Sequence, residues 1–319
     1  MITGRAPIGA PGRIMTHFAI AGLQLALPRG DNLDRIAEEI RLVRRRFGWV
    51  DMVVLGELSC FGPATAHAQP LPGPAEDAFA AMAREHGLWL VNGSLFERDG
   101  DAIYNTTSVF APDGSIAARH RKIYPFYPYE EGVTGGSEPT VFDVPGVGRF
   151  GLAICYDIWF PEVVRSLIWR GAEVILNPVM TNTIDRDVEL SIVRAAAATS
   201  QAYVVSVNVA GDLGYGRSCV AGPGGEMIHE AGQGREVIAV DLDLDHVRRC
   251  RERGWHGLGQ PLKSLRDGPQ HFEAYDRGPA ASPALRALGP LIQPASSRDG
   301  PAARDGAGTP AMTQKGGKP

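Results

Sequence analysis

The residues around Cys155 carry the pattern most suggestive of chemistry in this chain. An apolar run over residues 150–154 predicts a buried strand that ends on the cysteine, and Pro161 with Glu162 begins an amphipathic segment that predicts a helix. A thiol between a strand end and a helix N-terminus is placed to act as a nucleophile, because the helix dipole and free N–H groups stabilise thiolate and developing oxyanion. The alternative is that Cys155 is a small buried hydrophobic residue, as most strand cysteines are. The segment by itself leaves both interpretations open.

Two further ionisable residues stand at the ends of predicted strands. Glu57 lies at the inner end of an otherwise apolar strand over residues 51–57, and Lys122 ends a strand over residues 115–122. Burial would raise the pKa of such a carboxyl toward the range of a general base, and a lysine at such a point can donate to an oxyanion. Taken singly, a solvated glutamate and a solvated basic edge are the ordinary alternatives.

The elements that must position these residues form a mixed pattern. Early strands alternate with amphipathic helices, and hairpin-like strand pairs follow, which favours an α+β or layered α/β domain with a mixed sheet. Residues 123–139 are rich in aromatics, proline and glycine, and so long a loop is typical of a functional segment. The predicted strands are 18–27, 51–57, 88–97, 104–111, 115–122, 140–144, 149–155, 173–178, 202–209, 218–221, 226–229 and 236–241, and the predicted helices begin near residues 31, 75, 161, 185 and 244.

Composition excludes several classes of protein. The 319 residues carry a net charge of −4 with 21% charged residues, so no basic surface favours a nucleic-acid or anionic-membrane partner. Four well-separated cysteines argue against a zinc site or a disulfide scaffold and favour a reducing cytoplasm, with neither metal nor cofactor. The apolar run 18–27 is interrupted by Gln24 and lacks a good cleavage site, so we interpret it as a core strand rather than a signal peptide.

Glu57, Lys122 and Cys155, in that order at three strand ends, resemble the catalytic triad of the nitrilase superfamily of carbon–nitrogen hydrolases. The resemblance runs from about residue 18 to about residue 269 and implies a four-layer α-β-β-α sandwich. It implies a thiol-dependent hydrolase that cleaves a non-peptide carbon–nitrogen bond through a cysteine thioester, with Glu57 as the base and Lys122 on the oxyanion. It also implies a homodimer or higher homo-oligomer, joined through the helices near residues 161–170 and 185–201.

Within the superfamily, Cys155-Tyr156-Asp157 and the loop over residues 122–130 resemble the aliphatic amidase and formamidase branches rather than true nitrilases. That likeness makes Glu130 the second active-site glutamate, with Glu131 as the one-residue alternative, and makes the backbone N–H of Tyr156 an oxyanion donor. Those amidases tend to differ from this chain at Tyr156, which leaves the substrate less defined than the chemistry. The residues expected to line the substrate pocket are Tyr127, Tyr129, Trp159, Asn177 and Met180.

The sequence leaves several further functions open. An N-carbamoyl amino-acid hydrolase or a nitrilase would use the same triad, and the former needs cations for a substrate carboxylate, for which Arg186 and Arg194 are candidates although helix-surface roles are favoured for both. A cysteine hydrolase using a Cys–His pair and a non-catalytic scaffold of the same fold are also compatible with the sequence. The expected organisation is a flexible extension over residues 1–16, a hydrolase domain over 17–278, and a disordered or subunit-wrapping tail over 279–319.

Overall fold

The structure, a computed structural model, describes residues 16–278, 281–289 and 291. Two units divide the chain. The larger contains Glu130–His271 and the described residues up to Phe126, and the smaller contains Tyr127–Tyr129 and the described residues from Phe272 onward. All of the layers described below belong to the larger unit.

The first sheet contains seven strands in the order β13-β1-β2-β3-β5-β4, with β6 also paired to β5. Neighbours β1, β2 and β3 run parallel, and the remaining pairs are antiparallel. Lys122 follows one strand of this sheet directly, and Glu57 follows another after a single residue, Gly56. The strands are β1 (His17–Gln24), β2 (Met52–Leu55), β3 (Trp89–Val91), β4 (Leu95–Asp99), β5 (Ala102–Phe110), β6 (Ile116–Arg121) and β13 (Glu236–Asp243).

The second sheet contains six strands in the order β12-β11-β10-β9-β8-β7. The central strands β8, β9 and β10 are parallel, so their carboxyl ends meet at one edge, beside which Cys155 lies. The strands are β7 (Thr140–Val144), β8 (Gly148–Leu152), β9 (Val174–Val179), β10 (Tyr203–Asn208), β11 (Cys219–Ala221) and β12 (Met227–Glu230).

Alternating side chains divide the core into three layers. Ile20, Met52 and Val54 point into a cluster shared with Phe150 and Leu152 of the second sheet, which places the main core between the sheets. The next residue along each strand points outward toward helices, as the period of two requires. Both faces of each sheet are therefore buried, which explains why the strands read as continuous apolar runs.

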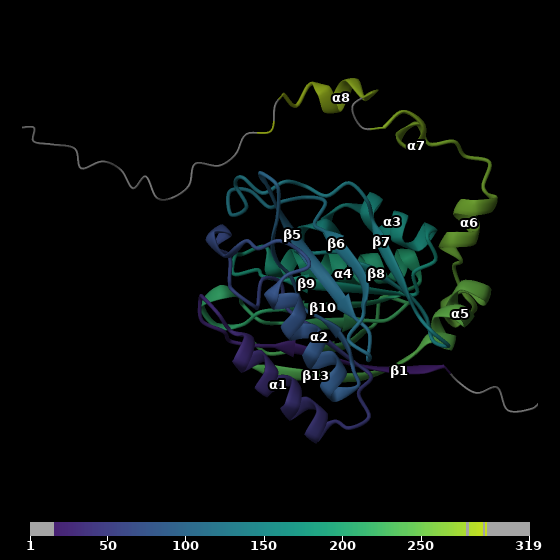
Figure 1. Ribbon diagram of the computed structural model, residues 1–319. Helices are drawn as coiled ribbons and strands as arrows, with labels where there is room; N and C mark the ends of the chain where they lie inside the picture. Colours follow the sequence, from purple (N-terminus) through teal and green to yellow (C-terminus); the bar gives the residue numbers. More distant parts are fainter. Residues whose placement is uncertain (1–15, 279–280, 290, 292–319) are drawn as a thin grey trace, which may run out of the picture. The chain divides into compact units, whose positions relative to one another are not determined.

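Helices cover the two outer faces (Figure 1). Helices α1 (Leu33–Arg46) and α2 (Pro74–His86) pack on the first sheet, and α3 (Pro161–Trp169) and α4 (Arg186–Ser200) pack on the second. Helices α5 (Leu244–Arg253) and α6 (Pro261–Asp267) follow β13. The expected four-layer α-β-β-α sandwich is confirmed.

One predicted strand, residues 88–97, is wrong as a single element. It divides into β3 and β4 at Gly93, whose φ is +75°. A Cβ at Gly93 would lie 1.9 Å from the carbonyl oxygen of Gly56, so only glycine permits this approach. The turn brings the Ser94 hydroxyl to the N–H of Leu58, 3.0 Å away, and so supports the segment that carries Glu57.

The smaller unit contains two short helices, α7 (Glu273–Arg277) and α8 (Pro283–Arg286). Apart from Thr16, the expected N-terminal extension over 1–16 lies outside the described residues, as does most of the expected tail over 279–319. Across the part of the chain that the structure describes, no helix combines the length and the apolar character needed to cross a bilayer.

Candidate active site

Lys122 lies between two buried carboxylates. Its ammonium nitrogen is 2.8 Å from Glu57 Oε1 and 2.6 Å from Glu130 Oε2, and the three side chains are 2%, 4% and 6% exposed respectively. Glu130 lies in a loop, and the backbone N–H of Phe126 donates to its Oε2 at 2.7 Å. The neighbouring Glu131 is exposed, so the structure brings Glu130 rather than Glu131 to the lysine.

Asn105 also joins the two glutamates, and the sequence analysis missed it. Its Nδ2 donates to Glu57 Oε1 at 2.8 Å and to Glu130 Oε1 at 2.7 Å. Its backbone carbonyl accepts from the N–H of Lys122 at 2.8 Å. In the sequence it is the first of four consecutive polar residues, 105–108, in β5, so nothing in the local pattern marked it as a site residue. Asn105 fixes the spacing of the two carboxylates around the ammonium.

The second oxygen of Glu57 faces the carboxyl end of β9. The backbone N–H of Met180 donates to Oε2 at 2.9 Å, and the N–H of Glu57 donates to the carbonyl of Val179 at 3.1 Å. Gly56 permits this contact between the sheets, because a Cβ there would lie 2.7 Å from a methyl group of Val209. The carboxylate is thus oriented by donors on both of its oxygens.

Cys155 adopts a left-handed backbone conformation with φ +46°. The strand expected to run to Cys155 ends instead at Leu152, and the cysteine begins a 3₁₀ turn over Cys155–Trp159 that precedes α3. Such a conformation is rare for a residue with a side chain and clusters at functional sites. The thiol is 6% exposed and lies 3.8 Å from the hydroxyl of Thr181.

Asp157 ties the cysteine turn to the segment after Lys122. One oxygen accepts from the backbone N–H groups of Ile123 at 3.0 Å and Tyr124 at 2.9 Å. The other accepts from the N–H of Ile154 at 3.0 Å and lies 3.2 Å from Nε2 of His120. The carboxylate is fully buried. Two segments far apart in sequence are thereby held at a fixed separation.

We expect Asp157→Asn to destabilise the fold, because an amide nitrogen would face donors that now meet an oxygen. A buried donor left unsatisfied costs about 1–3 kcal/mol, and urea unfolding would measure this loss. Asp143→Asn is the matched control, since Asp143 is an exposed carboxylate bonded to Arg149 at 2.7 Å and should leave unfolding nearly unchanged. Equal urea midpoints for Asp157→Asn and the wild type would contradict the role of Asp157 in holding the two segments together.

Comparison with known proteins places this arrangement in a family. The family model for carbon-nitrogen hydrolase matches residues 18–252. The chain belongs to the carbon–nitrogen hydrolase family. It is 31% identical to the omega-amidase NIT2 of Xenopus tropicalis over 262 residues, covering 75% of this chain and 93% of that protein. Human omega-amidase NIT2 is 29% identical, again over 75% of this chain and 93% of the relative.

Solved structures agree with this assignment. Nit3 of Saccharomyces cerevisiae, a member of branch 10 of the nitrilase superfamily, aligns with a TM-score of 0.70 and 28% identity, covering 76% of this chain and 96% of that one. An amidase mutant from Nesterenkonia sp. AN1 aligns with a TM-score of 0.66 and 25% identity, covering 79% and 100%. That structure shows the acetamide moiety of fluoroacetamide added covalently to the active-site cysteine.

Burial governs the protonation of this hydrolase's polar cluster. It raises the pKa of Glu57, an effect that Glu130 adds to and that Lys122 and a hydrogen bond with the Cys155 thiol oppose. Burial works against the charged form of Lys122, but Glu57 and Glu130 outweigh it and raise the lysine pKa well above its usual range. Burial also raises the pKa of the Cys155 thiol. The charge of Glu57 adds to this rise, and the charge of Lys122 opposes it. Without a bound substrate, the site therefore favours Cys155 as a neutral thiol and Lys122 as an ammonium.

The residues expected to line the substrate pocket lie in different environments. Asn177 is buried and donates to the carbonyl oxygens of Ala153 at 2.8 Å and Cys155 at 3.5 Å, so its amide supports the cysteine turn. Met180 supplies its backbone to Glu57, and Trp159 is half-buried with its ring 5.8 Å from that of Tyr156. Tyr127 and Tyr129 belong to the smaller unit. A pocket role stays a prediction for all five residues.

The other thiols lie apart from the cluster. Cys60 and Cys219 are buried within two separate helix–sheet layers, and burial raises the pKa of both, that of Cys219 to about 11. Cys250, on α5, is also buried. Among the residues with described positions, no three His, Cys, Asp or Glu side chains are grouped to hold a metal ion.

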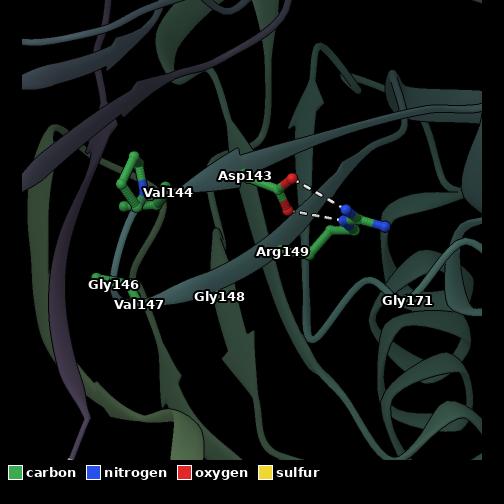
Figure 2. A pocket seen from close by; sticks show the side chains of 8 residues that line it. Asp143, Val144, Gly146, Val147, Gly148, Arg149 and Gly171 are labelled. Carbon is green, nitrogen blue, oxygen red and sulfur yellow. Dashed lines mark hydrogen bonds and ion pairs between the residues drawn. The ribbon is translucent and has the colours of Figure 1, made fainter.

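Two surface hollows of this hydrolase lie away from the polar cluster. Figure 2 shows one of about 480 Å³ around the β7–β8 hairpin, where Asp143 and Arg149 form an ion pair. Neither this hollow nor a second one, which Arg119 and Arg121 line, contains any of the expected site residues. The polar cluster with Cys155 is the arrangement that fits carbon–nitrogen hydrolysis.

Proposed function

We propose that this carbon–nitrogen hydrolase cleaves a linear amide of a small molecule through a thioester on Cys155, releasing ammonia or an amine and a carboxylic acid. The observation that carries the proposal is the buried Glu57–Lys122–Glu130 cluster beside the left-handed turn of Cys155. An acid, an ammonium and a thiol so arranged supply a base, an oxyanion partner and a nucleophile. The similarity to omega-amidases and to an amidase with an active-site cysteine supports the same reaction.

In the first half of the reaction, the Glu57 carboxylate takes the thiol proton as the sulfur bonds to the amide carbonyl carbon. The carbonyl electrons move to oxygen, which the ammonium of Lys122 and the backbone N–H of Tyr156 stabilise. Two of the three lysine protons are directed at Glu57 and Glu130, so one is left for the oxyanion. The intermediate then collapses, the carbon–nitrogen bond breaks, and the nitrogen leaves with the proton from Glu57.

In the second half, Glu57 takes a proton from water, which attacks the thioester carbonyl. The carbon–sulfur bond breaks, the thiolate recovers the proton, and the carboxylic acid leaves. Glu130 keeps its contact with Lys122 throughout and orients the substrate nitrogen. One carboxylate thus serves as base and acid in turn, oriented by hydrogen bonds from Asn105 and Met180.

A substrate panel tests the proposal. Purified protein would be assayed for ammonia release from short aliphatic amides, ω-amides of dicarboxylic acids, ureido acids and nitriles, with carbon dioxide measured in parallel. We expect amides to be hydrolysed without carbon dioxide, in a reaction that requires Cys155. Hydrolysis of ureido acids or nitriles in preference to every amide would overturn the amide assignment.

The arginine considered for an N-carbamoyl substrate is already engaged. Arg186 is 2% exposed, and its guanidinium lies 2.9 Å from the buried carboxylate of Glu189. Because that carboxylate neutralises it, Arg186 gives little support to recognition of a substrate carboxylate. Arg194 donates to the carbonyl of Gly225 at 3.1 Å, which supports a structural role for it too.

The pH dependence of hydrolysis should follow the buried base. Glu57 accepts a proton only when ionised, and burial raises its pKa above the ordinary value of 4.5. We therefore expect kcat/KM to fall as the pH drops through that raised pKa, so the acid limb lies above pH 4.5. A pH–rate profile over the range in which circular dichroism shows the fold intact would measure it. An acid limb centred at or below pH 4.5 would contradict Glu57 as the base.

We also propose a homodimer or higher homo-oligomer formed through the α3–α4 face. Three large apolar side chains are exposed at or beside these helices: Trp169 at 84%, Ile184 at 90% and Val188 at 48%. Burying such a patch against a second copy would remove it from water. Sedimentation of the wild type and of Trp169→Asp tests this.

A reducing, cytoplasmic location is supported by the free state of all four cysteines.

A further inference from the structure

A second polar chain, separate from the Glu57–Lys122–Glu130 cluster, reaches Cys155. The Cys155 sulfur lies 3.8 Å from the Thr181 hydroxyl, which donates to Glu189 Oε1 at 2.8 Å. The other oxygen of Glu189 accepts from Arg186 Nη1 at 2.9 Å, and Nη2 of the arginine donates to the carbonyl of Arg217 at 2.8 Å. Thr181, Glu189 and Arg186 are 6%, 4% and 2% exposed. None of these three residues has a role in the reaction described above.

The chemistry of Glu189 sets the direction of these hydrogen bonds. An ionised carboxylate only accepts, so the single hydroxyl hydrogen of Thr181 is committed to Glu189. The hydroxyl oxygen therefore faces the thiol with its lone pairs, as an acceptor for the S–H whenever that hydrogen is not bonded to Glu57. Arg186 pairs with Glu189 at 2.9 Å, and both side chains are buried.

The position of Thr181 is itself tightly held. The side chain of Asn208, at the end of β10, accepts from the N–H of Thr181 at 2.9 Å and donates to its carbonyl at 3.0 Å. Asn208 also donates to the carbonyl of Gly216 at 2.9 Å. With both backbone groups fixed and the hydroxyl bonded to Glu189, the oxygen that meets the sulfur has little freedom to move.

We propose that Thr181 is a positioning residue for the Cys155 thiol, oriented by Glu189 and Arg186, and that it holds the resting sulfur in the geometry from which attack begins. The inference rests on the proposed function, since it takes Cys155 as the nucleophile. Thr181 does not itself accept the thiol proton, which goes to Glu57. Its role is to fix the position of the sulfur between Glu57 and Glu189.

The same chain influences how readily the thiol ionises. The charged groups that face Cys155 are Glu57 and Lys122 from the first sheet, Glu130 bonded to that lysine, and Glu189 from α4 with Arg186 behind it. Burial raises the thiol pKa, Glu57 and Glu189 raise it further, and Lys122 opposes them. Glu189 therefore helps to keep the thiol protonated until an amide is bound.

Valine and serine at position 181 test the positioning role. Valine matches threonine in shape but lacks the hydroxyl, so we expect Thr181→Val to lower kcat roughly 10- to 100-fold with KM changed little. Thr181→Ser restores the hydroxyl and should recover most of kcat. Thr183→Val is the matched control, since that hydroxyl bonds to Asp185 at 2.8 Å instead. Wild-type kcat in Thr181→Val would overturn the proposal.

Alkylation of Cys155 by iodoacetamide provides a readout that needs no amide substrate. Glu189→Gln removes the negative charge, and its amide can donate to the Thr181 oxygen, which turns the hydroxyl hydrogen toward sulfur. We expect the midpoint of the alkylation pH profile to fall by about one unit or more. An unchanged midpoint in a folded Glu189→Gln variant would overturn the proposed influence of Glu189 on the thiol.

The two proposals fail in different ways. If Cys155→Ala still hydrolyses amides, the proposed function fails, whatever the Thr181 variants do. If Cys155→Ala is inactive but Thr181→Val and Glu189→Gln match the wild type, only the positioning role fails. Because Thr181→Val and Thr181→Ser leave the Glu189–Arg186 ion pair in place, they decide the question even where Glu189→Gln does not fold.

Discussion

Cys155→Ala should lose amide hydrolysis by roughly 10⁴- to 10⁶-fold, because no other group can form the thioester. The fold should persist for two reasons. The thiol is a weak hydrogen-bonding group, and its polar contacts are the one to the Thr181 hydroxyl at 3.8 Å and those to Glu57 and the Met180 backbone, so little stabilising energy is removed. Alanine also keeps the Cβ of cysteine, so the left-handed backbone at this position is no more strained than before. Steady-state ammonia release and urea unfolding, measured side by side, check both expectations.

Cys60→Ala is the matched control for Cys155→Ala. Cys60 is a fully buried thiol that follows the same strand as Glu57, but it packs among apolar side chains of α1, α2 and the first sheet. Its removal should leave kcat unchanged and lower stability slightly through the small cavity formed. Undiminished turnover in Cys155→Ala, or an equal loss in Cys60→Ala, would contradict the assignment of the nucleophile.

The sequence singled out candidate residues that end or follow strands. Glu57, Lys122 and Cys155 each interrupt an apolar run with an ionisable group, which is costly unless the group is paired or functional. The structure brings the first two to 2.8 Å, as that reasoning requires. Glu130 needed more, since only its spacing from Lys122 in a resembling family distinguished it from the exposed Glu131.

The residues that hold the site together were not predictable in the same way. Asn105 lies in the middle of a strand, and its function depends on two glutamates 48 and 25 residues away. Asp157 stands two residues after the cysteine, yet its partners lie across a loop, 33 and 34 residues earlier. Thr181 and Glu189 are ordinary residues of a turn and a helix. The roles that we propose for them depend on tertiary contacts, which no local sequence pattern records.

Backbone detail was the least predictable feature. The strand expected to reach Cys155 stops three residues earlier, because the cysteine takes a left-handed conformation that any propensity disfavours. Likewise, the break between β3 and β4 at Gly93 follows from the close approach of Gly93 to Gly56, the residue after β2. In both places the local preference yields to the geometry around Glu57 and Cys155, as is common at functional sites.

Lys122→Met should impair both catalysis and folding. Methionine is close to lysine in length but carries no charge, so the oxyanion loses a donor, which typically costs about 10²- to 10³-fold in turnover. The larger consequence is electrostatic. Glu57 and Glu130 would remain buried without their shared cation, and breaking a buried ion pair in this way costs about 3–5 kcal/mol. Urea unfolding of the variant at neutral pH would measure the loss of stability.

The loss should depend on pH with a definite sign. Burial raises the folded-state pKa of Glu57 above its ordinary value of 4.5, and removing Lys122 takes away the cation that opposes this rise. A group with a raised folded pKa favours the folded state once protonated, so the variant should regain stability as the pH falls through that pKa toward 4.5. Lys263→Met is the control, since the ammonium of Lys263 donates to a backbone carbonyl at the surface. A destabilisation of Lys122→Met that stays constant across this range would show that lost packing, rather than the uncompensated carboxylates, is its cause.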